Sequence, residues 1–298
     1  MLQSSLLFAP AGDLAISLIA GLFGLMIGSF LNVVIHRLPV MLDRQWRAQA
    51  AEIEGRPPPD EPKYNLIAPR SACPGCKAPI TALQNIPVLS WLVLRGKCAN
   101  CRRPIGARYP LVELLTGVLS ALVAWRFGFG WACVAGLVLT CFLVALTFID
   151  VDTQLLPDDL TLPLLWLGIL VSVVLPQVAD ARLPVDLRSS CIGAIAGYLS
   201  LWSVFQLFRL VTGKEGMGYG DFKLLAALGA WLGWQMLLPI VLGAAGVGAI
   251  LGILLIVTGQ RHRGIPMAFG PYLAAAGWLA LMFGPELVAR YLALYGRN

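Results

Sequence analysis

The sequence predicts an all-α polytopic membrane protein with about eight transmembrane helices. Apolar residues make up 58% of the 298 residues, charged residues only 13%, and the mean hydropathy is +0.77. Soluble domains carry about 25% charged residues. Long uncharged stretches also alternate with short polar segments, and Lys and Arg are spread unevenly along the chain. We therefore expect a lipid bilayer to surround most of the protein.

The first apolar stretch runs from Leu14 to Ile35 without a charge. At about 1.5 Å per residue it can cross a hydrocarbon core of about 30 Å. A polar segment of residues 37–110 follows, with 12 of the 22 Lys and Arg residues and a proline-rich linker at 57–62. We expect a small soluble domain here, with a short interfacial helix around Met41 to Glu54.

Further apolar stretches predict the remaining spans. The 36 uncharged residues from Leu224 to Gly259 would form a helix about 54 Å long, much longer than a bilayer is thick. We therefore predict two short spans there, with a turn near Trp234 to Pro239. The other predicted spans are Leu111 to Trp125, Trp131 to Ile149, Leu160 to Val178, Ser190 to Phe208 and Ile265 to Phe283.

The basic residues predict the orientation. With the amino end outside, the inner segments hold 17 Lys and Arg residues, among them Arg209, Lys214, Lys223, Arg261 and Arg263. The outer segments hold 5, namely Arg126, Arg182, Arg188, Arg290 and Arg297. Because cytoplasmic loops carry the excess of basic residues, residues 37–110 are expected in the cytoplasm. The same orientation puts Asp150 and Asp221 on one face of the membrane, since two spans separate them.

Four cysteines predict a metal site in the polar segment. Cys73 and Cys76 form one C-x-x-C pair, Cys98 and Cys101 form a second, and 21 residues lie between the two pairs. This spacing is typical of four-thiolate zinc sites, and a cytoplasmic location disfavours disulfides. We expect a structural Zn²⁺, because four protein ligands leave no position for a reactive water.

A cysteine domain of this kind can also bind nucleic acid. The basic residues near it lie directly before the second span, where anionic lipid headgroups attract them equally well. We therefore expect a lipid surface and no nucleic acid as the partner. These residues are Arg95, Lys97, Arg102, Arg103 and Arg108.

Two aspartates are the candidate catalytic residues. Asp150 ends an apolar stretch, and Asp221 follows the glycine-rich segment 213–220 directly before another. Ionisable residues at membrane depth are usually functional, although a solvated Asp in a flexible loop is the simpler alternative. Two adjacent carboxylates can share a proton and carry out acid and base chemistry on water. Paired acids also relay protons, so a proton-coupled transporter using Asp150 and Asp221 is the alternative function.

The chain resembles the type IV prepilin peptidases, membrane aspartyl proteases with a G-x-G-D motif. The resemblance covers most of the chain, and Gly218, Tyr219, Gly220 and Asp221 form that motif. Other matching segments are residues 28–39, the two C-x-x-C pairs with residues 85–91 between them, residues 108–113, residues 149–158 and the continuation of the motif to Leu225.

The resemblance implies a catalytic pair, Asp150 and Asp221, supported by Gly218, Gly220 and Lys223. It also implies cleavage of the basic leader of type IV prepilins or pseudopilins at the cytoplasmic face of the bacterial inner membrane. Methyl transfer from S-adenosylmethionine to the new amino terminus is implied as well, although no glycine-rich loop after a strand indicates a cofactor pocket. The predicted domains are residues 1–36, the first span; 37–110, the zinc domain; and 111–298, the peptidase domain. The first two would carry methyl transfer.

Overall fold

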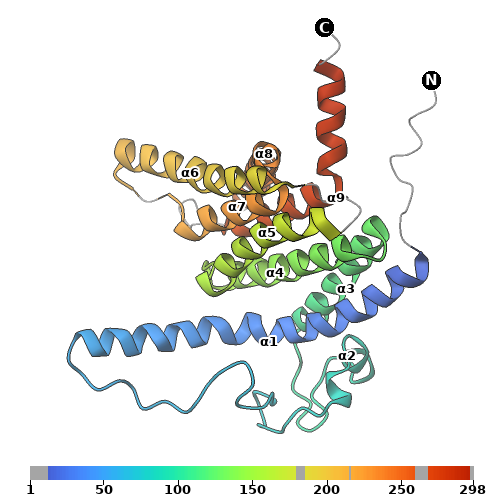
Figure 1. Ribbon diagram of the computed structural model, residues 1–298. Coiled ribbons are helices and arrows are strands. Elements are labelled where there is room, and N and C mark those ends of the chain that lie inside the picture. Colours follow the sequence, from blue (N-terminus) through green and yellow to red (C-terminus); the bar gives the residue numbers. More distant parts are fainter. Residues whose placement is uncertain (1–12, 179–184, 215, 259–267, 296–298) are drawn as a thin grey trace. The chain divides into compact units, whose positions relative to one another are not determined.

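The computed structural model describes residues 13–178, 185–214, 216–258 and 268–295. Within these ranges the chain forms nine α-helices and no strand, which confirms the predicted all-α class (Figure 1). Some basic residues used to predict the orientation, Arg182, Arg261, Arg263 and Arg297, lie outside the described residues, and only the backbone of Arg290 is described.

Among the residues that the structure describes, six helices are long and apolar enough to cross a membrane. Two further helices, α7 (Tyr219–Leu232) and α9 (Gly270–Tyr295), fall where spans were predicted, but the six do not include them. The predicted count of eight spans is therefore not confirmed, although a multi-pass protein is. The six are α1 (Leu14–Ile53), α3 (Arg108–Phe127), α4 (Trp131–Thr153), α5 (Asp158–Val178), α6 (Leu187–Thr212) and α8 (Leu237–Val257) together with the short 3₁₀ helix before it.

Helix α1 differs from the prediction because it is one continuous helix of 40 residues. A span ending at Ile35 and a separate interfacial helix from Met41 were expected. Pro39 lies inside the helix, where it removes one backbone donor without ending the helix. At about 1.5 Å per residue α1 is about 60 Å long, so its second half extends well beyond the thickness of a hydrocarbon core.

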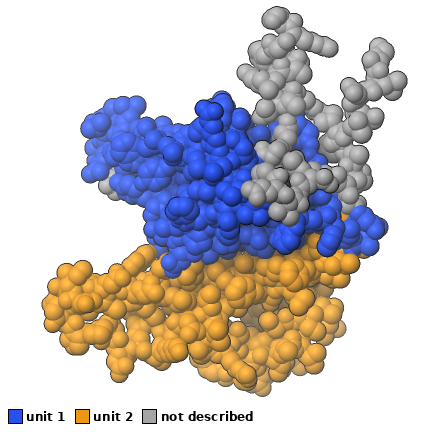
Figure 2. Space-filling model, viewed as in Figure 1, with its two compact units in different colours: residues 1–16, 123–298 blue, residues 17–122 orange. Residues whose placement is uncertain are grey.

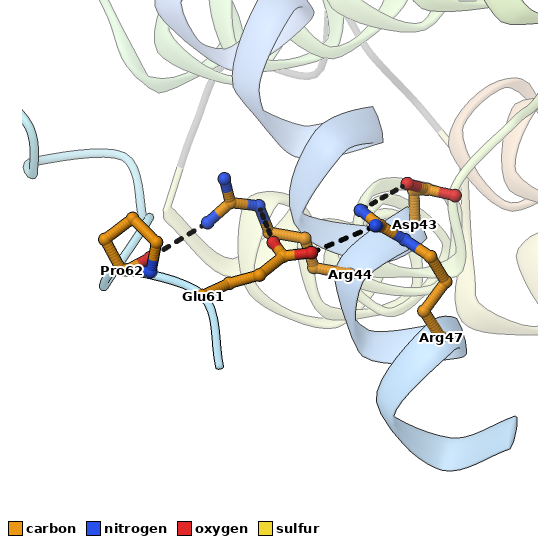
Figure 3. Close-up of polar contacts among 5 residues, drawn as sticks. All are labelled: Asp43, Arg44, Arg47, Glu61 and Pro62. Atoms are coloured by element: carbon orange, nitrogen blue, oxygen red, sulfur yellow. Dashed lines mark hydrogen bonds and ion pairs between the residues drawn. The ribbon is translucent and has the colours of Figure 1, made fainter. Parts of the chain in front are cut away.

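The second half of α1 is fastened to the linker that follows it. The guanidinium of Arg44 pairs with the carboxylate of Glu61 at 2.7 Å and donates to the carbonyl of Pro62 at 2.9 Å. Arg47 pairs with the other oxygen of Glu61 at 2.9 Å and with Asp43 on its own helix (Figure 3). The proline-rich linker therefore runs back along α1 through side chains spaced about one helical turn apart.

Buried Arg37 continues this attachment. Its guanidinium donates to the carbonyl of Asn65 at 2.8 Å and to that of Pro69 at 2.6 Å, and it lies over the ring of Tyr64. An arginine that is only 7% exposed needs such acceptors, since an unpaired buried charge is costly. Arg37 thus links α1 to the segment that leads into the cysteine domain.

The chain divides into two compact units, with the boundary inside α3 (Figure 2). One unit comprises residues 17–122, which include most of α1, the linker and the cysteines. The other contains residues 123–298 together with the first 16 residues. These units reflect packing alone, so the predicted functional domains stay a prediction.

Helix α7 lies at the centre of the unit that contains residues 123–298. It packs against α5, α6 and α9, and 11 of its 14 residues are buried (Figure 1). Its length is about 21 Å, which is too short to cross a bilayer. Because most of its residues are buried against these neighbouring helices, α7 is surrounded by protein over most of its surface.

Glycines allow α6 to approach α7 closely. A Cβ added at Gly229 of α7 would lie 2.2 Å from the carbonyl oxygen of Gly193 in α6, and Gly197 faces the carbonyl of Leu225 in the same way. Small residues of this kind let helix backbones touch in membrane proteins. On the α5 side, Trp231 donates its indole N–H to the carbonyl of Leu164 at 2.7 Å.

The predicted turn between the two short helices is confirmed. Helix α7 ends at Leu232, a 3₁₀ turn covers Trp234–Met236, and α8 begins at Leu237. Gly233 has φ +83°, a conformation that glycine adopts without the strain of a side chain. Ser189 and Gln235, which are hydrogen-bonded to each other, lie within 3 Å of the position a Cβ would take at Gly233.

Candidate functional site

Asp150 lies in the last turn of α4 and is only 4% exposed. The helix ends because Gln154 adopts the left-handed conformation, with φ 54°, while its N–H still donates to the carbonyl of Asp150. The carboxylate accepts a hydrogen bond of 2.9 Å from the backbone N–H of Gly270, the first residue of α9. Negative charge is unfavourable at the carboxyl end of a helix, so this donor from the amino end of α9 stabilises the carboxylate.

Asp221 lies in the first turn of α7 and is 7% exposed. Gly218 is the residue before the helix, which makes Asp221 the third helical residue. From that position an acidic side chain reaches back to the N–H of the residue before the helix, and the carboxylate of Asp221 bonds the backbone of Gly218 in this way. The amino end of α7 therefore favours a negative charge at this site.

The structure brings the two aspartates together. They lie in the same compact unit, both are buried, and the carboxylate of Asp150 acts electrostatically on that of Asp221. Neighbouring carboxylates oppose each other's ionisation, so a pair of this kind can share one proton. The arrangement can therefore provide an acid and a base for one water molecule.

Leu156 fills the space beside the pair. A Cβ at Gly220 would lie 2.7 Å from the Cβ of Leu156, and one at Gly270 would lie 3.1 Å from its Cδ1. The loop after α4 thus packs between the beginnings of α7 and α9. Gly220 is required by this close approach, whereas Gly218 has φ −80° and a Cβ there would have ordinary van der Waals room.

Lys223 does not pair with Asp150 or Asp221 but with a third acidic residue, Asp158. Its ammonium bonds both carboxylate oxygens of Asp158, at 2.6 and 2.8 Å, in the first turn of α5. The pair is partly exposed, so it connects α5 and α7 at the edge of the unit. Asp152 and Asp159 are exposed, which separates them from the buried pair.

Aromatic rings fix the beginning of α7 against α6. Phe222 is fully buried, and its ring lies 5.6 Å from that of Phe205 and 5.9 Å from that of Tyr198, between ring centroids. The ring of Tyr219 lies 5.3 Å from that of Phe205, between centroids, and is tilted by 59° relative to it. Tyr219 and Phe222 flank Asp221 in the sequence, so their contacts with the rings of α6 hold the turn that carries its carboxylate.

Gly270 is a residue of the site that was not predicted from the sequence. The signal was present, because Gly270 and Pro271 directly precede an apolar run, and proline is favoured in the first turn of a helix. No spacing rule, however, indicates that the free donor of that turn would reach a carboxylate 120 residues earlier.

The four predicted cysteines cluster in the other unit. The sulfur atoms of Cys73, Cys76, Cys98 and Cys101 all lie within 4.8 Å of one another, and those of Cys73 and Cys101 are 3.7 Å apart. A tetrahedral zinc with bonds of about 2.3 Å to sulfur separates its ligands by about 3.8 Å. The cluster could therefore hold a metal ion, and all seven cysteines of the chain are free thiols.

The two C-x-x-C pairs have the same backbone geometry. The N–H of Cys73 bonds the carbonyl of Ala78, and the N–H of Cys98 bonds the carbonyl of Arg103, both at 2.9 Å. The residue after each pair, Lys77 or Arg102, has φ 59°. Each pair thus forms a tight turn closed by a single isolated bridge, without a strand.

These turns direct backbone N–H groups at the sulfur atoms. Such donors, from Cys76 and Gly75 for example, lower the pKa of the Cys73 thiol, and similar donors lower the pKa of Cys76 and Cys98. The N–H of Arg103 also favours the Cys101 thiolate, but burial and the three neighbouring thiols raise its pKa to about 11. Thiolates are the form that binds metal, so the turns prepare three of the ligands.

A buried carboxylate joins three segments of the same unit. Glu113 of α3 is 9% exposed and accepts a hydrogen bond of 2.7 Å from the N–H of Val88, and its carboxylate also bonds Ser29 of α1. Val88 has φ 58°, which is strained for a β-branched residue. Glu113 therefore holds the loop before the second cysteine pair in a conformation that it would otherwise avoid.

Comparison with known proteins places the chain in a family. Residues 22–127 match the bacterial peptidase A24 N-terminal domain, and residues 137–253 match the type IV leader peptidase family. A protein of Aeromonas hydrophila named prepilin leader peptidase/N-methyltransferase is 58% identical over 91% of this chain and 92% of its own length.

Proteins of the same name from Pseudomonas aeruginosa and Stutzerimonas stutzeri are 53% and 52% identical. The first alignment covers 97% of this chain and 98% of the relative, and the second covers 96% of both. No solved structure matches. Because the identity is high over nearly the whole length, the chain belongs to the type IV leader peptidase family.

Proposed function

We propose that this chain is a prepilin leader peptidase and N-methyltransferase, with Asp150 and Asp221 as its catalytic pair. The observation that carries the peptidase assignment is the meeting of these two buried carboxylates at the ends of α4 and α7. Relatives that are more than half identical to this chain bear this name. Neither relative is named as a transporter, so the comparisons do not support the alternative function. The substrates would be type IV prepilins or the related pseudopilins.

The paired carboxylates would activate one water molecule. The ionised carboxylate takes a proton from the water, whose oxygen attacks the carbonyl carbon of the scissile peptide bond. The protonated carboxyl hydrogen-bonds the carbonyl oxygen as negative charge develops there. The leaving nitrogen then takes a proton as the carbon–nitrogen bond breaks, so no covalent intermediate with the enzyme forms.

The position of the pair suits a substrate that stays in the membrane. Asp150 lies in the last turn of one apolar helix, and Asp221 lies in the first turn of another. A prepilin with a basic leader followed by an apolar helix would present its scissile bond at that depth. The positive-inside bias of the sequence supports a cytoplasmic face, in the inner membrane of a bacterium, with the amino end outside.

The cysteine cluster would hold one structural zinc ion. Four sulfur atoms at tetrahedral spacing fit Zn²⁺ and leave no open position for a substrate or a water. The ion would fix the fold of residues 37–110 and would take no part in cleavage. No nucleic acid is required by this role.

Methyl transfer would use S-adenosylmethionine as the methyl donor. The part of the chain proposed for it is residues 1–110, because residues 111–298 contain both aspartates. Glu113 borders that part and holds together segments from α1 and the loop at Val88. We assign no residue to the methyl donor. The product pilin would serve type IV pili or a type II secretion system.

Leader cleavage in detergent tests the peptidase assignment. Asn has nearly the shape of Asp but cannot ionise, so Asp150→Asn and Asp221→Asn should each lower cleavage at least about 100-fold. Asp159→Asn is the matched control, since Asp159 is exposed, and should keep more than about half the rate. The measurement is the mass shift of a leader-bearing prepilin.

Methylation of a peptide supplied without its leader reports whether the variants are folded. Both Asn variants should methylate this peptide at the rate of the unchanged protein. Full cleavage by either Asn variant would contradict the assignment of the pair.

A further inference from the structure

The amino end of α9 supplies a third component of the candidate site, a backbone N–H group beside the two aspartates. In a helix the first N–H groups have no partner within the helix. Pro271 has no N–H, and the N–H groups of Tyr272 and Leu273 bond the carbonyl of Phe269. The first donor, that of Gly270, points instead to Oδ2 of Asp150 at 2.9 Å, in a buried position.

The close approach leaves no room for a side chain at Gly270. A Cβ there would lie 2.6 Å from Oδ2 of Asp150 and 3.2 Å from its Cγ. Such a Cβ would displace the carboxylate of Asp150. It would also lie 3.1 Å from Cδ1 of Leu156. Space, and not a backbone conformation restricted to glycine, therefore requires glycine at this position.

Helix α9 is fixed to both helices that carry the aspartates. Two turns beyond Gly270, the indole N–H of Trp278 donates to the hydroxyl of Thr140 in α4 at 3.1 Å. Gly277 packs against Leu228 of α7, where a Cβ would lie 2.5 Å from a methyl carbon. The donor at the start of α9 is thus held in a defined place relative to α4 and α7.

We propose that Gly270 is a positioning residue for leader cleavage, and this proposal rests on the function proposed above. Its N–H fixes the orientation of the Asp150 carboxylate toward Asp221, and the amino end of α9 compensates for the unfavourable carboxyl end of α4. The absence of a side chain lets that donor approach to bonding distance. Gly270 acts through Asp150 and does not touch the substrate.

The test is Gly270→Ala, measured as leader cleavage by the purified full chain in detergent. The added methyl displaces the carboxylate, and a misplacement of about 1 Å can cost about 100-fold in rate. We expect kcat to fall at least about 10-fold while KM changes less than about twofold, because substrate contacts remain. Gly243→Ala is the control: its Cβ would lie 3.7 Å from Ala276, an ordinary contact, and kcat should not change.

Leu156→Ala distinguishes two explanations for a low kcat in Gly270→Ala, namely a misplaced Asp150 carboxylate and a general loss of packing. In the double variant Gly270→Ala/Leu156→Ala the methyl has room on the leucine side, so thermal stability should recover while kcat stays low. Recovery of kcat to the level of Leu156→Ala alone would overturn the proposal, as would an unchanged kcat in Gly270→Ala. Either outcome leaves the proposed function standing if Asp150→Asn is inactive, whereas an active Asp150→Asn variant removes the function itself.

Discussion

The aspartate pair and the cysteine cluster are held in place by different forces. Around the aspartates, α7 has 11 of its 14 residues buried and touches α6 through backbone atoms. Between residues 61 and 107, by contrast, only Cys73 and Gly96 are buried. A segment with so little buried apolar surface cannot repay its conformational entropy through packing, and a metal usually supplies the missing free energy.

Because different forces hold them, the two regions should tolerate different kinds of substitution. The cysteine region depends on four thiols, on Glu113 and on the arginines of α1. The aspartate region depends on close contact between helices, so added volume should harm it more than the loss of an exposed charge. Changes in one unit should leave the other largely intact, since each unit has its own contacts.

Removal of the metal should give the largest effect. Structural zinc contributes about 10–16 kcal/mol of apparent binding free energy in small domains. Purified protein should contain one zinc per chain, and Cys98→Ser or a chelator should expose residues 61–107 to trypsin while the helices of the other unit stay protected. Limited proteolysis with mass spectrometry measures this.

Cys191→Ser is the matched thiol control, because Cys191 lies on α6 outside the cluster. It should change neither the zinc content nor the cleavage pattern. Protein purified without oxygen that holds no zinc would refute this account of the cysteine region.

Added volume between α6 and α7 should give the next largest effect. In Gly229→Ala the new methyl meets the backbone of Gly193, which cannot rotate away as a side chain can. Overpacking of this kind costs about 1–3 kcal/mol or more. We expect a lower melting temperature in detergent and reduced leader cleavage, with unchanged zinc content.

Gly246→Ala provides the comparison for this change, because a Cβ at Gly246 meets nothing within 4 Å among the described residues. It should melt like the unchanged protein. Equal melting temperatures for the two alanine variants would show that the contact between α6 and α7 is not tight.

Composition and spacing predicted much of this fold. The all-α class, the turn between α7 and α8 and the cysteine cluster follow from long uncharged stretches and from two C-x-x-C pairs. Two spans were not confirmed, because apolar length alone does not distinguish a helix that crosses a bilayer from α7, which is short and buried in protein. The break expected before Met41 was wrong, since Pro39 lies within a continuous α1.

The aspartate site could be predicted only in part from the sequence, and the reason is physical. Asp150 and Asp221 are visible in the sequence because carboxylates are rare beside apolar stretches. Their partners are backbone groups and small residues such as Gly270, whose role depends on tertiary packing. In the same way the strained Val88 and its partner Glu113 could not be paired from spacing, because 25 residues separate them.

The ion pair of Lys223 with Asp158 should give the smallest effect. The sequence motif suggested a supporting role for Lys223, and the structure shows its contact with α5. Partly exposed ion pairs contribute about 0–1 kcal/mol and weaken with salt, so Lys223→Gln and Asp158→Asn should each lower the melting temperature slightly. If Lys223 acts only through Asp158, the double variant should be no worse than either single one, and KM for the prepilin should stay within about twofold. A rise in KM confined to Lys223→Gln would instead assign this lysine to substrate binding.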